Sequence, residues 1–190
     1  MIKAILVFNN SGIPRFLKFY KHYSEAEQQH ILKTTYDLVS LRRTDEPYFL
    51  DASPLMGPDS QLVYRHYVTL YFVFCVDSAE NELVVLDMIK LFVETLDKQF
   101  ECVRELDLIF HCDKVNEILN EFVQGGLIAE VDGRNILHHV REQEKIKQQE
   151  NSTSAKAIRT LGTINFNISR PFKQLGLPDF TQFANDMDKL

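Results

Sequence analysis

Two adjacent strand-like segments near the middle of the chain constrain the fold more than any other feature. Residues 61–67 and 68–77 are rich in β-branched and aromatic side chains, and the second reads Val-Thr-Leu-Tyr-Phe-Val-Phe-Cys-Val almost without a polar break. A strand of that kind is typical of a sheet that is covered on both faces. The sequence therefore predicts a layered domain with helices on the two sides of a sheet.

Further strands are predicted at the beginning of the chain. Met1–Asn9 and Ile13–Tyr20 have strand composition, and the Asn-Ser-Gly sequence between them is typical of a tight hairpin turn. A short strand is predicted at Tyr48–Asp51, inside a stretch rich in Pro, Gly and Asp that covers residues 44–60.

Apolar residues at helical spacing predict the helices. The first helix begins at the capping box Ser24-Glu25-Ala26-Glu27 and ends near Leu41. Gly125-Gly126 is predicted to end a later helix as a C-terminal glycine pair. The remaining predicted helices cover residues 81–100, 105–111, 113–124 and 132–149.

This order of elements predicts an α/β (α+β) domain with an antiparallel sheet between helices. The domain is predicted to comprise residues 1–149. Residues 150–190 lose the apolar periodicity and are rich in polar side chains, so they are expected to form a flexible, mostly disordered tail.

Charge and cysteine content narrow the class of protein. The net charge is −6, from 21 Lys+Arg and 27 Asp+Glu, which argues against a generic binder of nucleic acid or of anionic membranes. No apolar run approaches the roughly 18 residues of a membrane span, and no signal-peptide pattern is present, so a cytosolic protein is expected. Cys75, Cys102 and Cys112 have apolar neighbours in sequence and are expected to be buried thiols of a reducing compartment.

The residue patterns give little support for a catalytic or metal-binding site. His111-Cys112-Asp113 has the residue types of a thiol triad, but adjacent residues on a helix point in different directions. Polar residues at a helix end beside a cysteine explain it better. The histidine and cysteine spacings fit no usual metal site, and no glycine-rich phosphate loop is present. We therefore expect no enzyme activity, no cofactor and no metal.

One ordered set of motifs is more specific. Leu62-Val63-Tyr64-Arg65, followed after four residues by Leu70-Tyr71-Phe72, resembles the signature of the clathrin-adaptor small chains. The opening Met1–Leu6, the second strand, Phe92–Asp97 and Glu105–Phe110 are similar to that family as well, so the resemblance covers about residues 1–145. Within the family, several segments resemble the sigma (small) subunits of adaptor complex 3: residues 64–67, 70–78 and 92–97, the long 44–60 loop and the extra C-terminal residues.

The resemblance implies a longin-like fold, a five-stranded antiparallel sheet flanked by helices. It also implies partners: two large adaptin subunits, of delta and beta type, and a medium (mu) subunit, in coats on Golgi and endosomal vesicle membranes. Such small chains recognise acidic dileucine sorting signals on cargo tails together with one large subunit, here for traffic from the Golgi and endosomes to lysosomes. Membrane association would then be peripheral, through the complex.

The resemblance also implies a cargo site. Arg15 would meet the acidic or polar residue upstream of the leucine pair. Ile13 replaces a Lys, and Cys102 replaces an Asn, that many relatives carry, so signal preference is expected to differ. In the variant Val93→Asp, the new carboxylate is expected to stay hydrated in the empty pocket, so the substitution is expected not to impair folding. The apolar pocket would be lined by Tyr67, Val68, Leu70, Val93, Cys102, Val103 and Leu108.

Three alternatives stand beside this assignment. The apolar pattern of Leu70, Val93 and Leu108 is also what core residues show, and only the resemblance suggests a pocket. The chain is also compatible with another longin-like trafficking module, such as a sigma subunit of a different adaptor complex or a coatomer small chain. A cysteine hydrolase using Cys112 is the third alternative.

Overall fold

The computed structural model describes residues 1–43 and 46–163, with side chains up to residue 149, and confirms the predicted fold class. A five-stranded sheet has the order β2-β1-β5-β4-β3, and every neighbouring pair is antiparallel. The strands are β1 (Ile2–Asn9), β2 (Pro14–Phe19), β3 (Phe49–Asp51), β4 (Ser60–Tyr67) and β5 (Leu70–Asp77). The helices are α1 (Glu25–Ser40), α2 (Ser53–Met56), α3 (Glu82–Phe100), α4 (Glu105–Phe110), α5 (Cys112–Phe122) and α6 (Gly133–Thr163).

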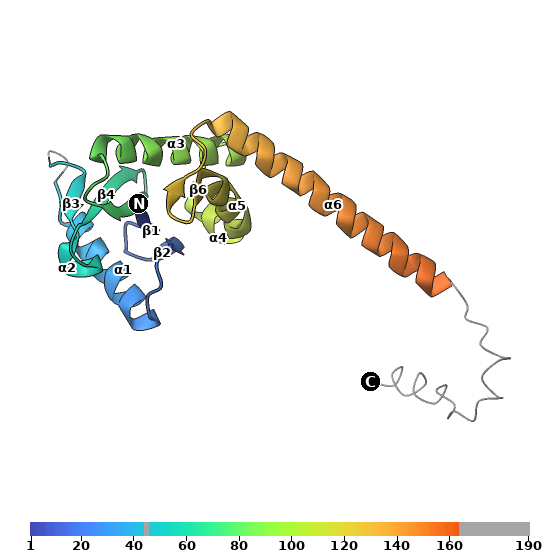
Figure 1. Cartoon of the computed structure of the whole chain (residues 1–190), viewed down its shortest axis with the longest axis horizontal. Coiled ribbons are helices and arrows are strands. Elements are labelled where there is room, and N and C mark those ends of the chain that lie inside the picture. Colours follow the sequence, from blue (N-terminus) through green and yellow to red (C-terminus); the bar gives the residue numbers. More distant parts are fainter. Residues whose placement is uncertain (44–45, 164–190) are drawn as a thin grey trace, which may run out of the picture. The chain divides into compact units, whose positions relative to one another are not determined.

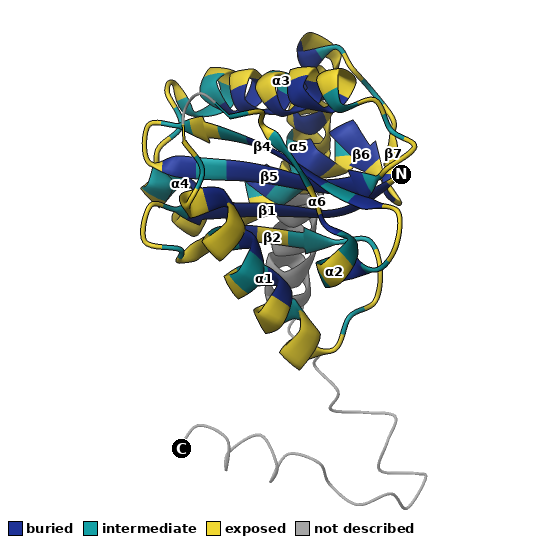
Figure 2. Ribbon diagram, turned by 90° about the vertical axis from the view of Figure 1, so that its left-hand side faces the viewer, coloured by how far each residue is buried: buried dark blue, intermediate teal, exposed yellow. Residues whose placement is uncertain are grey.

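Helices cover both faces of the sheet, as the apolar character of β5 predicts (Figure 1). One apolar cluster lies between the sheet and α3, α4, α5 and the beginning of α6. A second cluster lies between the opposite face and α1 and α2. β1 and β5 are buried along almost their whole length, because they are central strands with packed side chains on both faces (Figure 2).

The helix starts agree with the local sequence signals. Ser24 caps α1, and Glu27 returns the interaction by accepting a hydrogen bond of 2.7 Å from the Ser24 backbone amide. Asn81 caps α3 by accepting a hydrogen bond of 3.0 Å from the Leu83 amide. These side chains satisfy backbone amides that the first turn of a helix leaves without an intrahelical partner.

Two predicted boundaries are corrected. Gly125-Gly126 forms the turn of a small hairpin, β6 (Val123–Gln124) and β7 (Leu127–Ile128), and both glycines have positive φ. The last helix does not end at residue 149, since α6 continues to Thr163. Residues 164–190 of the predicted tail lie outside the described residues. Met1–Lys145 pack as one compact unit, and the division into domain and tail at residue 149 stays a prediction.

A buried lysine ties β1 to the end of β5. The Lys3 side chain is only 7% exposed, and its Nζ lies 2.8 Å from Asp77 Oδ1 and 2.7 Å from Ser60 Oγ. The hydrogen bond from Lys3 lowers the pKa of Asp77 below its ordinary value. The carboxylate therefore stabilises the fold when it is ionised.

Asp77→Asn is expected to lower the free energy of unfolding by about 1–2 kcal/mol at pH 7, because it leaves Lys3 without its counter-charge. The effect is no larger because the side chain of Asp77 is 35% exposed, so water screens the ion pair. Since the folded-state pKa is depressed, this contribution is complete above the unfolded pKa of about 4. It is lost as the pH falls through the folded-state value. Urea unfolding should therefore show a larger difference between wild type and Asp77→Asn at pH 7 than at pH 3, while Asp37→Asn on the exposed side of α1 should leave stability unchanged at both pH values. Equal stability of wild type and Asp77→Asn at pH 7 would contradict the assignment.

Candidate functional site

Arg15 is the extra residue of a β-bulge in β2. Val7 of β1 pairs with Phe16 and Phe8 pairs with Pro14, so the ladder passes over Arg15. A bulge commonly redirects a side chain. Here the guanidinium contacts Glu105, the first residue of α4, although 90 positions separate the two in sequence.

A single carboxylate oxygen joins β1, β2 and α4. Glu105 Oε1 accepts a hydrogen bond of 2.6 Å from Arg15 Nε, and Arg15 Nη2 forms an ion pair with the same oxygen. Asn9 Nδ2 donates to that oxygen over 3.0 Å. The Oδ1 atom of Asn9 accepts hydrogen bonds from the Ser11 and Ile13 amides, so Asn9 also closes the β1–β2 turn. Arg15 is thus held in a defined position.

The link between α3 and α4 is tightly bonded. The Val103 amide donates to Asp97 Oδ1 over 2.9 Å, and the Arg104 amide donates to Asp107 Oδ2 over 2.8 Å. Glu101 and Cys102 both have positive φ, of 51° and 89°. Asn tolerates positive φ better than most residues do. This explains physically why an Asn suits position 102, where the resemblance implies that Asn is the usual residue.

Three of the predicted pocket residues belong to one buried cluster. Leu70 of β5, Val93 of α3 and Leu108 of α4 lie in the same apolar core, and Tyr67 and Val103 pack against it while partly exposed. The ring of Tyr67 lies edge-on to Phe72, with centroids 5.9 Å apart, and burial raises its pKa. Val93 is 6% exposed. The expectation that an aspartate there stays hydrated therefore does not suit the closed arrangement.

Val68 lies apart from that cluster, at the tip of the β4–β5 hairpin. Tyr67 pairs with Leu70, so Val68 and Thr69 form a two-residue loop. Val68 has φ of 54° and its side chain is 91% exposed. A β-branched residue is unfavourable at positive φ, where Gly or Asn is usual. The chain therefore presents an apolar side chain to solvent at a strained position.

The structure brings the predicted residues to one end of the sheet. Asn9, Leu70 and Tyr67 are neighbours across β1, β5 and β4. Arg15 connects to that end through Glu105, three residues before Leu108. Cys102 is exposed in the α3–α4 link. The acidic partner of Arg15 was not among the predicted residues. Its position in sequence carries no local signal, because the contact depends on the tertiary arrangement.

The predicted burial of the cysteines is correct for Cys75 and wrong for the other two. Burial raises the pKa of the Cys75 thiol to about 12, whereas Cys102 and Cys112 are exposed. Cys112 Sγ lies 3.9 Å from Asp113, while the ring of His111 packs near Phe100. Exposure alone would make Cys112 accessible to a thiol reagent, so such labelling is not evidence for a nucleophile.

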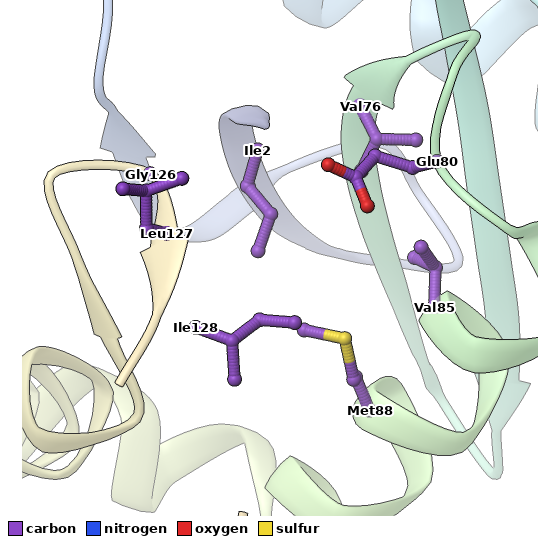
Figure 3. A pocket seen from close by; sticks show the side chains of 8 residues that line it. All are labelled: Ile2, Val76, Glu80, Val85, Met88, Gly126, Leu127 and Ile128. Atoms are coloured by element: carbon purple, nitrogen blue, oxygen red, sulfur yellow. The ribbon is translucent and has the colours of Figure 1, made fainter. Parts of the chain in front are cut away.

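A pocket of about 370 Å³ opens beside Ile2, at the end of β1 that lies away from Asn9 and the predicted cargo residues (Figure 3). Ile2 and Asn9 mark the two ends of this strand, roughly 23 Å apart at the usual rise per residue. The pocket and the predicted cargo residues are therefore separate features. Its lining comes from β1, β5, α3, the β6–β7 hairpin and the β5–α3 turn: Ile2, Val76, Glu80, Val85, Met88, Gly126, Leu127 and Ile128.

A membrane span or a metal centre would be recognisable in the described residues. Among their helices, none combines the length and apolar character needed to cross a bilayer. Within the same residues, His, Cys, Asp and Glu side chains form no group of three that could hold a metal ion.

Comparison with known proteins decides the family. The sequence profile of the clathrin adaptor complex small chain matches residues 1–147. The chain belongs to this family. Its relatives include the AP-3 complex subunit sigma-2 of Homo sapiens, 49% identical over 172 residues, covering 90% of this chain and 89% of the relative. The AP-3 complex subunit sigma of Dictyostelium discoideum is 47% identical over 170 residues, covering 88% and 99%.

A comparison with solved structures agrees with the assignment of this chain to the adaptor small chains. One chain in a homology model of the full-length AP-3 complex, in a stretched open conformation, matches with a TM-score of 0.62 and 38% identity. The match covers 80% of this chain and 99% of that one. The predicted resemblance to the small subunits of adaptor complex 3 is thereby confirmed, and with it a role in vesicle coats and protein transport.

Proposed function

We propose that this adaptor small chain recognises acidic dileucine sorting signals, as part of a heterotetramer that acts without catalysis in traffic from the Golgi and endosomes to lysosomes. The observation that supports the proposal most is the convergence of the assigned residues. Arg15, Tyr67, Leu70, Val93 and Leu108 come from five different elements and meet at one end of the sheet.

The two parts of a dileucine signal suit this end of the domain. An apolar cluster lies beside a cation, and two leucines each contribute roughly 1.5–3 kcal/mol when fully buried. Because Leu70, Val93 and Leu108 are already buried, the leucines would have to displace the half-buried Tyr67 and Val103 that pack against them. Exposed Val68 extends the same end outward.

Exposed apolar side chains support assembly with the other subunits, two large chains of delta and beta type and a medium mu chain. Leu106, Ile109 and Phe110 of α4 are all exposed, and Phe110 is exposed to 74%. Leu127 and Ile128 of β7 are exposed as well. Apolar groups gathered on short elements are typical of surfaces that a partner covers.

Val68→Asn tests the cargo site. Asn tolerates positive φ, so the isolated fold is expected to gain about 0.5–1 kcal/mol of stability. Loss of the exposed isopropyl group is expected to weaken binding of a dileucine peptide to the assembled complex about fivefold or more. Peptide titration measures the binding, and co-purification of the other three subunits is the folding control.

The control is Val131→Asn, which changes another exposed valine, between β7 and α6, that is 63% exposed. It is expected to leave peptide binding unchanged. If Val68→Asn binds the peptide like wild type, the assignment of this hairpin to the cargo site is wrong.

A further inference from the structure

Glu105 occupies the guanidinium that the proposed function assigns to the cargo acid. Its Oε1 is bonded to both Nε and Nη2 of Arg15. That edge of a guanidinium is one with which arginine binds a carboxylate through two parallel hydrogen bonds. The side chains of Arg15 and Glu105 are 20% and 28% exposed, so water shields the pair only partly.

Asn9 holds the Arg15–Glu105 pair in place, and the uncharged Ile13 adds no second cation to it. Asn9 donates to the same Glu105 oxygen over 3.0 Å and is itself fixed by the β1–β2 turn. Ile13, which is half exposed, contributes no positive charge beside Arg15. An incoming carboxylate therefore meets a cation whose charge is already balanced by the chain's own carboxylate.

We propose that Glu105 determines the signal specificity of this site by competing with the acidic residue of the cargo for Arg15. The inference rests on the proposed function. Its consequence is a weak preference for acidic over neutral residues upstream of the leucine pair. Removal of the charge at position 105, with the hydrogen-bonding shape kept, should then increase that preference.

Glu105→Gln is the appropriate change, because the amide oxygen still accepts hydrogen bonds from Arg15 and Asn9. The assay measures binding of two fluorescent dileucine peptides to the assembled heterotetramer, one with Glu and one with Gln upstream of the leucines. Wild type is expected to prefer the Glu peptide by less than about threefold, the scale of a screened ion pair. Glu105→Gln should bind the Glu peptide about three- to tenfold more tightly and the Gln peptide unchanged.

Glu101→Gln is the matched control, since it removes a carboxylate just before α4 and should alter neither affinity. A wild-type preference of tenfold or more would overturn the inference without any variant. Unchanged or weakened binding of both peptides by Glu105→Gln would also overturn it and assign Glu105 a structural role. Equal strengthening of both peptides would do the same. If wild type binds neither peptide, the dileucine assignment itself is wrong and the inference falls with it.

Discussion

Gly126→Ala is expected to destabilise the domain by about 3 kcal/mol or more. Gly126 has φ of 84°, and its carbonyl accepts a hydrogen bond of 2.8 Å from the Ile2 amide. A Cβ atom there would collide with the carbonyl oxygen of Ile2, which is backbone and cannot rotate away. The cost combines the unfavourable backbone conformation with the loss of contact between the β6–β7 hairpin and β1.

Gly125→Ala is the control for the same turn. Gly125 has φ of 58°, but an added Cβ atom would meet open space. Its replacement is expected to cost about 1 kcal/mol, the conformational term alone. Urea unfolding of both variants measures the difference. If the two variants are equally stable, the close approach of the hairpin to β1 is wrong.

Val93→Asp is the second change with a large expected effect. Val93 belongs to the cluster that joins α3 to the sheet, and a carboxylate there would be removed from water without a counter-charge. The expected loss is about 3–5 kcal/mol, enough to prevent folding or assembly of a marginally stable domain. Thermal unfolding and co-purification with the partner subunits measure it.

Val84→Asp on the same helix is the matched control. Val84 is half exposed in the first turn of α3, where a negative charge suits the helix dipole. It is expected to change stability by less than about 0.5 kcal/mol. A Val93→Asp variant that folds and assembles would contradict the buried placement and show that the pocket is open in the complex.

The elements and their layering could be predicted from the residues alone. Runs of β-branched and aromatic residues located the five strands, and apolar residues at helical spacing located most helices, because burial imposes these patterns locally. The apolar run of β5 predicted a strand covered on both sides, and the structure confirms it. The capping box that begins at Ser24 acts within a few residues of the helix it begins, so it too could be recognised without a fold.

Local patterns were less informative where two structures share one signal. Gly125-Gly126 is compatible with a helix end and with a hairpin turn, because both need positive φ. The hydrogen bond from the Ile2 amide to the Gly126 carbonyl supports the hairpin. It joins two residues that are far apart in sequence, so no local pattern could predict it. The burial of Cys75 and the exposure of Cys102 and Cys112 likewise depend on which face of an element is covered.

The arrangement of the candidate site follows from contacts between segments that are distant in sequence. The resemblance named Arg15, but the bulge that redirects it arises from the register of β1 against β2. Its pairing with Glu105 connects residues 90 positions apart. Leu70, Val93 and Leu108 have the same apolar pattern as any core residue, while Val68 differs from them through its turn conformation and exposure. Sequence patterns record the local preference of a segment, whereas charge pairing and burial depend on which distant segments meet it in the folded chain.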